Sequence, residues 1–357
     1  MKVFFYVQHL LGIGHLKRAA TLARALRAAG FEVTLASGGA PVEGIAVLQL
    51  PPASSPDFKK LLDEEGNPID EAWRKRRREA LLEAYRASKA EILLIELFPF
   101  GRRQMRFELL PLLEAANARL VVCSVRDLIQ PRPEREDETL ATFERYFDRL
   151  LVHGDPRVAT FERTFGQASR LAGRLHYTGY VVEEPETKGD AGAGEVLVSA
   201  GGGAVGRRLL ETAIAARALT RLRDRTWRVL AGVNAKDIES LGGEGVVVER
   251  SRNDFTLRLR NCVLSVSQAG YNTVMETLRG GARSVLVPFA GGGESEQALR
   301  AKLLAQRGLV QMVEEKELAP ATLAAAIDRA AAGAPPAPGA VDFGGARRSA
   351  ELLREWA

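Results

Sequence analysis

The sequence predicts an α/β protein made of two Rossmann-like domains. Two observations lead to this fold class. Apolar runs of strand length alternate with glycine turns and helical stretches, first from residue 2 and again from residue 194. The length of 357 residues also suits two domains, since one domain usually has roughly 100–200 residues. Apolar strands that alternate with helices imply parallel sheets covered on both faces.

The first half contains five apolar runs that we expect to form buried strands. A glycine turn follows the first run, and residues 15–30 then place Leu16, Ala20 and Ala23 at helical spacing before stopping at Gly30. Glycine is common at the C-terminal end of a helix. The expected strands are residues 2–9, 32–37, 91–98, 119–125 and 149–154.

The second half repeats this rhythm after a polar segment rich in glycine and proline. We take residues 183–194 as a linker between a domain of residues 1–182 and a domain of residues 195–335. The terminal segment 336–357 ends in an amphipathic stretch, which we expect to pack back toward the first domain. Further strands are expected directly after residue 194 and over residues 227–232, 245–250, 262–268 and 283–289.

Composition excludes several classes of protein. The net charge of +5 and the aromatic content of 6% do not make the dense basic stripe of a nucleic-acid binder, although the basic excess suits anionic partners. No run reaches the roughly 18 apolar residues that a membrane span needs, and the N-terminus has the pattern of a first strand rather than a signal peptide. We therefore expect a cytoplasmic protein. Cys123 and Cys262 lie in apolar runs without a CxxC or histidine neighbour, so buried free thiols and no metal site are expected.

A basic run from Arg74 to Arg78 leaves two interpretations open. It can be the solvated face of a helix with ion pairs four residues apart. It can also be a basic patch that contacts an anionic acceptor or lipid headgroups, which would make the protein peripheral at the inner face of the membrane.

Ligands of open parallel sheets bind beyond the carboxyl ends of the strands, so we examined the residues that follow each expected strand. The stretch "GIGH" holds Gly12, Gly14 and His15 and opens a helix whose N-terminal amides can meet a ligand. A neutral histidine there is a candidate general base; the alternative is a histidine that only caps or packs. Lys17 stands where the last glycine of a dinucleotide-binding fingerprint would be.

Glycines also follow two strands of the second half. Gly201, Gly202 and Gly203 in "SAGGGAVG" precede a helix and are candidates for a phosphate site, with a plain tight turn as the alternative. Gln268 and Gly270 follow a later strand.

The next stretch carries candidate sugar-binding groups. Glu276 lies within the helix that follows Gly270, where its carboxylate can accept both hydroxyls of a ribose or can be a partner of the helix dipole. Glu296 and Gln297 begin the next helix, after a loop that contains Gly292 and Gly293.

Four motifs resemble a known family. They are "GIGHLKRAATLARAL", "SAGGGAVG", "SQAGYNTVMETLRGGARSVLVPF" and "ESEQALRAKLLAQRG", and they are similar to the two-domain GT-B glycosyltransferases, above all family 28. The resemblance implies that the two domains face each other across a cleft, with an acceptor-binding first domain and a donor-binding second domain. It places Gly201 to Gly203 and Gly270 at the diphosphate, Glu276 at the ribose, Glu296 and Gln297 at the hexose, Arg250 and Phe255 at the base, and His15 at the acceptor loop.

The implied reaction moves a hexosyl or N-acetylhexosaminyl group from a nucleotide diphosphate sugar, with UDP favoured, to an acceptor that the sequence does not name. A GT-B enzyme needs no metal and no cofactor beyond this co-substrate. His15 would deprotonate the acceptor, with Asp127 or Glu96 in support, or Glu96 would itself be the base. Arg102 and Arg103 would grip an anionic acceptor. The alternatives are a nucleotide-sugar hydrolase or 2-epimerase, and a nucleotide-sugar-binding protein without catalysis.

Overall fold

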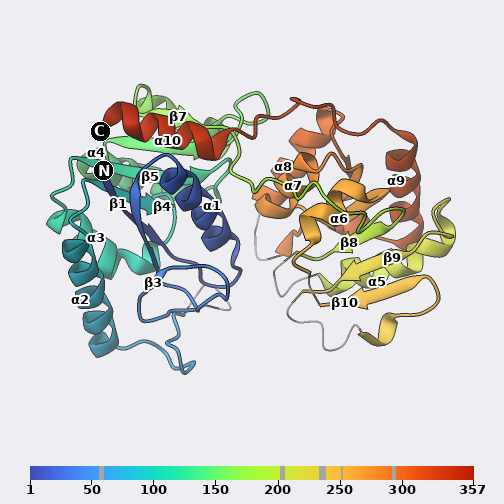
Figure 1. The fold of residues 1–357 in the computed structure, drawn as a ribbon, viewed down its shortest axis with the longest axis horizontal. Helices are drawn as coiled ribbons and strands as arrows, with labels where there is room; N and C mark the ends of the chain where they lie inside the picture. The colour runs from blue at the N-terminus through green and yellow to red at the C-terminus, as the bar shows by residue number, and fades with distance from the viewer. Residues whose placement is uncertain (56–59, 202–205, 233–238, 251, 292–294) are drawn as a thin grey trace. The chain divides into compact units, whose positions relative to one another are not determined.

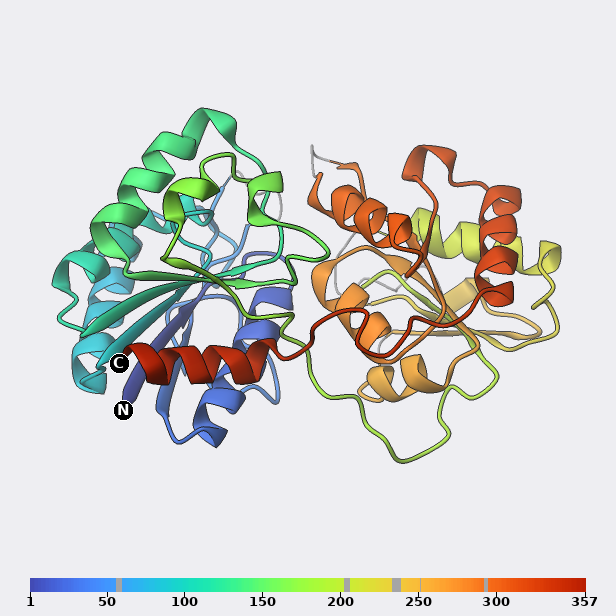
Figure 2. The ribbon, with the colours of Figure 1, turned by 90° about the horizontal axis from the view of Figure 1, so that it is seen from above.

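Two compact units form the chain in the computed structural model, which describes residues 1–55, 60–201, 206–232, 239–250, 252–291 and 295–357. The first unit comprises Met1–Val181 and Asp342–Ala357, and the second comprises Val182–Val341. Each unit has its own parallel sheet with helices on both faces (Figures 1 and 2). The predicted α/β class with two Rossmann-like domains is confirmed.

The first unit holds a seven-stranded sheet in the order β3-β2-β1-β4-β5-β6-β7. Every neighbouring pair of strands is parallel. Its elements are β1 Lys2–Val7, α1 Gly14–Ala28, β2 Glu32–Ser37, β3 Leu48–Gln49, α2 Glu71–Ser88, β4 Ile92–Glu96, α3 Arg106–Ala115, β5 Leu120–Arg126, α4 Glu136–Tyr146, β6 Arg149–His153, β7 Leu175–Tyr177 and α10 Gly345–Trp356.

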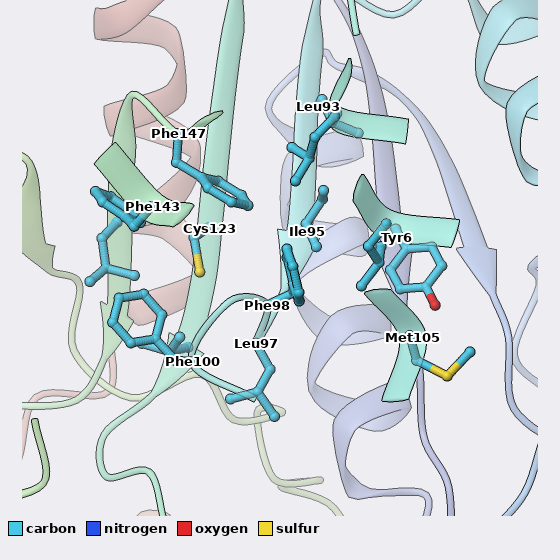
Figure 3. Close-up of a cluster of buried hydrophobic side chains, with 14 of the residues drawn as sticks. Tyr6, Leu93, Ile95, Leu97, Phe98, Phe100, Met105, Cys123, Phe143 and Phe147 are labelled. Atoms are coloured by element: carbon cyan, nitrogen blue, oxygen red, sulfur yellow. The ribbon is translucent and has the colours of Figure 1, made fainter. Parts of the chain in front are cut away.

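Successive residues of β1 enter opposite faces of this sheet, as the period of a strand requires. Phe4 and Tyr6 belong to the cluster that packs under α2, α3 and α4, whereas Val3 and Phe5 belong to the cluster under α1 and α10. Figure 3 shows part of the first cluster, in which Tyr6, Leu93, Ile95 and the phenylalanines after β4 converge. Burial on both faces explains why the strands read as continuous apolar runs.

The second unit holds a six-stranded sheet in the order β10-β9-β8-β11-β12-β13. Its main cluster packs β8, β9, β11 and β12 against α5 and α9, with Trp227 completely buried. The elements are β8 Val196–Ser199, α5 Arg207–Ala216, β9 Trp227–Leu230, β10 Val246–Glu249, α6 Phe255–Asn261, β11 Leu264–Gln268, α7 Tyr271–Arg279, β12 Ser284–Val287, α8 Glu296–Gln306, β13 Gln311–Met312 and α9 Pro320–Ala332.

The C-terminal segment returns to the first unit. The backbone N–H of Asp342 donates to Oδ2 of Asp155 at 2.9 Å, and Gly179, at φ +84°, leaves room for the Asp342 side chain. Helix α10 then packs against α1, so that the two ends of the chain lie close together in Figures 1 and 2. Residues 183–194, predicted as a linker, contain no helix or strand.

The basic run on α2 is not one continuous patch. Arg77 is completely buried and its Nε lies 2.8 Å from Oε2 of Glu108, while Arg76 on the outer face pairs with Glu64. The interpretation of Arg74 to Arg78 as a single lipid-facing surface is therefore wrong for Arg77. Consecutive residues of a helix point in different directions around its axis, and the side chain of Arg77 points into the core. Among the residues that the structure describes, no helix is long and apolar enough to cross a membrane.

Candidate functional site

Each sheet has a switch point, where the chain leaves neighbouring strands toward opposite faces. In the first unit it lies between β1 and β4, and in the second between β8 and β11. Ligands of open α/β sheets bind at such points. The segments that carry most of the predicted site residues follow these four strands.

His15 and Glu96 meet at the first switch point. Helix α1 begins at Gly14 and presents His15 in its first turn, while Glu96 ends β4. Nδ1 of His15 lies 2.8 Å from Oε1 of Glu96, and Arg18 of α1 donates to the same oxygen. Arg18 was missed by the sequence reasoning, although its place one helical turn after His15 was a usable signal.

Burial governs the charges of this pair. It lowers the pKa of His15 to about 3, and the nearby Glu96 carboxylate opposes the shift only in part. Burial alone would raise the pKa of Glu96, but His15, Arg18 and Arg102 outweigh it and bring that pKa to about 2. At neutral pH the pair is a neutral imidazole beside a carboxylate.

This arrangement sets the tautomer of His15. A neutral imidazole beside an ionised carboxylate carries its proton on the nitrogen that faces it, here Nδ1. Nε2 is then the proton acceptor. Nε2 makes no hydrogen bond to any residue of the described part of the chain.

Asp127, the other candidate partner of His15, lies one strand further along the sheet. It follows β5, and its Oδ1 accepts a hydrogen bond of 2.8 Å from the backbone N–H of Leu128. Gly154 packs against its Cβ so closely that a side chain at position 154 would collide with Asp127. Of the two carboxylates, the structure brings Glu96 to His15.

The glycine segments of the second unit surround the second switch point. Gly201 adopts φ +72°, which favours glycine, and its N–H is bound to Oγ of Ser199 at 3.1 Å. A Cβ at Gly201 would lie 3.6 Å from Oγ1 of Thr273 in α7, which brings the loops after β8 and β11 together. Gly202, Gly203, Gly292 and Gly293 lie outside the described residues.

Helix α7 begins directly after Gly270, and a Cβ at Gly270 would have no atom of the described residues within 4 Å. The N-terminus of α7 is the positive end of the helix dipole, and the amides of its first turn lie outside the hydrogen bonds of the helix itself. Glu276 lies half-buried in the second turn of α7. A Cβ at Gly12 of the first unit would likewise have no described atom within 4 Å.

Glu296 and Gln297 occupy the first turn of α8. Glu296 is buried, and Oε1 of Gln297 accepts a hydrogen bond of 3.3 Å from the backbone N–H of Phe289. At the other side of the sheet, Arg250 follows β10 with an exposed side chain, and its carbonyl accepts the N–H of Gly232 at 2.6 Å. Phe255 begins α6, is partly buried, and packs against the small cluster of Leu197, Leu230 and Leu259.

Comparison with known sequences gives a family match within the second unit. Residues 232–337 match the profile of the glycosyltransferase family 28 C-terminal domain. This stretch of the second unit is therefore similar to that domain. The match includes β11, α7 and α8, the elements that carry Gln268, Gly270, Glu276, Glu296 and Gln297.

One curated relative is the UDP-N-acetylglucosamine–N-acetylmuramyl-(pentapeptide) pyrophosphoryl-undecaprenol N-acetylglucosamine transferase of Rhodopseudomonas palustris (strain BisA53). It is 28% identical over 191 residues, which are 51% of this chain and 49% of that protein. The chain thus aligns with about half the length of this relative.

Solved glycosyltransferase structures share the whole fold. The calicheamicin glycosyltransferase CalG4 has a TM-score of 0.65 at 16% identity over 99% of this chain and 98% of that chain. MurG of Acinetobacter baumannii has a TM-score of 0.61 at 14% identity over 99% of each chain. The spinosyn rhamnosyltransferase SpnG, solved with thymidine diphosphate, has a TM-score of 0.64 at 17% identity over 99% of each chain. The protein therefore has the GT-B fold, and residues 232–337 of its second unit are similar to the family 28 C-terminal domain.

Arg300 lies within the matched stretch of residues 232–337, and the sequence reasoning gave it no role. It is buried on α8, its Nη1 donates to the carbonyl of Ala269 at 3.2 Å, and its guanidinium lies over the ring of Tyr271. Arg300 therefore ties the helix of Glu296 and Gln297 to the turn of Gly270.

Proposed function

We propose that the protein transfers a hexosyl group from a nucleotide diphosphate sugar to a hydroxyl or amine of an acceptor, without a metal ion. The observation that carries the proposal is the His15–Glu96 pair of 2.8 Å at the switch point of the first unit, in a chain whose residues 232–337 are similar to the family 28 C-terminal domain. The proposal assigns the donor to the second unit and the base to the first.

The base would be Nε2 of His15. Glu96 holds Nδ1–H, and its negative charge stabilises the imidazolium that forms when Nε2 takes the acceptor proton. Arg18 keeps Glu96 ionised and fixed, so Glu96 is a positioning residue and not the base itself. This role follows from geometry, since His15 retains 16% of its side-chain exposure and Glu96 only 1%.

The donor would lie at the N-terminus of α7. Backbone amides near Gly270 and Gly201 are suited to the diphosphate, Glu276 to the ribose, and Glu296 with Gln297 to the hexose. Oriented amides and dipoles can stabilise the leaving diphosphate in place of a metal. The curated relative is named as a transferase that acts with UDP-N-acetylglucosamine, and this supports UDP and an N-acetylhexosamine as the donor to test first.

A nucleotide-sugar hydrolase is the second candidate. It would use the same donor site and the same His15 to activate water instead of an acceptor. A chain that releases free sugar from a UDP-sugar without added acceptor, at a rate that no added acceptor raises, is a hydrolase.

The testing experiment is a thermal-stability scan of the full chain with UDP-, GDP- and dTDP-sugars. A ligand that binds only the folded protein at 100 times its Kd stabilises it by about 2.7 kcal/mol, which raises the melting temperature by a few degrees. We expect a UDP-sugar to give the largest rise. The proposal fails if no nucleotide sugar raises the melting temperature.

A further inference from the structure

The carboxyl edge of the first sheet holds more positive than negative groups around His15. Arg18 and Arg102 interact electrostatically with Glu96, and Arg102 also interacts with Arg18 and Arg126. The carboxylates are Glu96 and Asp127, which directly follows Arg126. Because His15 is neutral at pH 7, this group of five residues carries a net positive charge.

Arg102 is held in place with most of its hydrogen-bonding capacity unused. Its Nε donates to the carbonyl of Gln8 at 2.8 Å, at the end of β1. Within the described chain, its two terminal nitrogens Nη1 and Nη2 make no hydrogen bond and no ion pair. Four N–H groups are thus presented in the planar fork that matches two oxygens of a phosphate or a carboxylate.

The backbone of Arg102 is also strained. Arg102 adopts φ 58°, and Leu97, at the start of the same turn, adopts φ 68°. Residues other than glycine in this region cost of order 1 kcal/mol, and they cluster at ligand sites, where the surrounding structure imposes the conformation. The turn from β4 to α3 adopts this unfavourable backbone conformation, and it places the guanidinium of Arg102 at the end of β1.

The neighbouring Arg103 is used differently. It shares the carboxylate of Glu138 with Arg106 on the surface of the unit. Only Arg102 of the predicted pair Arg102 and Arg103 is therefore directed to the His15 site. Arg18 is likewise engaged, since it binds Glu96.

We propose that the acceptor carries an anionic oxygen group, a phosphate or a carboxylate, that binds the terminal nitrogens of Arg102 near Arg126, while its reacting hydroxyl lies at Nε2 of His15. This proposal rests on the proposed function. In the transfer step the hydroxyl proton passes to Nε2 and the acceptor oxygen forms the new bond to the sugar C1. The bond from C1 to the diphosphate breaks, and the nucleoside diphosphate leaves with the bonding pair.

Calorimetric titration of the full chain with inorganic phosphate and, separately, with acetate tests this site. We expect one of the two anions to bind, and the Arg102→Gln variant to weaken that binding at least tenfold. Arg103→Gln is the matched control and should change the affinity less than twofold. Tighter phosphate binding indicates a phosphorylated acceptor, and tighter acetate binding a carboxylate. The proposal is overturned if neither anion binds, or if Arg102→Gln binds as the unchanged protein does.

Two further measurements keep the result interpretable. Arg102→Lys retains the charge without the fork and should give an intermediate affinity, and all variants are compared by circular dichroism and melting temperature. Phosphate bound at the second unit is not altered by Arg102→Gln, so the difference between the variants isolates the Arg102 site. The scan with nucleotide sugars reports independently on the donor, so failure of one proposal is distinguishable from failure of the other.

Discussion

Nδ1 of His15 lies 2.8 Å from Oε1 of Glu96, although 81 positions separate them in the chain. Gly12 and Gly14 follow β1, and α1 begins at Gly14 with His15 in its first turn. Strand β4 is hydrogen-bonded to β1, and this pairing places Glu96, the last residue of β4, beside His15. Arg18 holds the carboxylate from the next helical turn. Burial keeps His15 neutral, and the contact with Glu96 fixes its tautomer so that Nε2 can accept a proton, as a general base must.

The first prediction concerns this pair. His15→Ala should lower kcat by at least 100-fold, since general base catalysis contributes roughly 10²–10⁴-fold, with little change in the KM for the donor. Glu96→Gln should lower kcat by a smaller factor. Steady-state assays of nucleoside diphosphate release measure both.

Asp127→Asn is the matched control for Glu96→Gln, because Asp127 follows the neighbouring strand β5 and accepts a hydrogen bond from the backbone N–H of Leu128. If Asp127→Asn reduces kcat more than Glu96→Gln does, the assignment of Glu96 is wrong.

The second prediction concerns the donor. Glu276→Gln should weaken nucleotide-sugar binding about tenfold, because a charge-assisted hydrogen bond contributes about 1.5–3 kcal/mol. Glu211→Gln is the control, since Glu211 is exposed on α5 and pairs with Arg207. Titration calorimetry should show the loss for Glu276→Gln alone, and equal losses in both variants would argue against a ribose contact.

The third prediction concerns Arg300. Arg300→Asn removes the hydrogen bond to the Ala269 carbonyl that joins α8 to the turn before α7. We expect the donor KM to rise about tenfold, the cost of one hydrogen bond from a charged group, with a smaller change in kcat. An unchanged KM in a folded variant would show that the turn keeps its position without Arg300.

The fourth prediction concerns the buried ion pair below the first sheet. Arg77 binds Glu108 and also donates to the carbonyl of Gly38 and to Oε1 of Gln8. Arg77→Ala leaves Glu108 buried without its partner and should lower the free energy of unfolding by about 3–5 kcal/mol.

Urea unfolding measures this loss. Arg76→Ala, which breaks only the exposed pair with Glu64, should cost less than about 1 kcal/mol. A similar small cost for Arg77→Ala would show that water reaches Glu108 in the variant.

The fifth prediction concerns pH. Burial lowers the pKa of both His15 and His153 from 6.5 to about 3 in the folded protein. Between these values the unfolded chain binds the protons and the folded protein does not, so stability falls as the pH drops below 6.5. Each histidine should cost about 2 kcal/mol at pH 5.

Melting temperatures between pH 7.5 and pH 5 test the sign. His153→Gln should flatten the pH dependence, whereas a melting temperature that rises on acidification would contradict neutral histidines.

The sequence by itself determined the two sheets, their parallel character and the residues at the ends of most strands. Strands that are buried on both faces appear in the sequence as long apolar runs. Glycines after β1, β8 and β11 indicate the turns that lead into the helices. The short edge strands β3, β7 and β13 were not predicted, because two or three residues are too few to show a pattern.

Only the tertiary structure decided which carboxylate contacts His15. Glu96 and Asp127 both follow apolar strands and look alike in sequence. The order of strands puts β4 directly beside β1 and β5 one strand further away, and strand order depends on packing across the whole sheet. The same holds for Arg77 and Arg102, whose burial and hydrogen-bond partners depend on the elements that surround them and not on the residues that flank them.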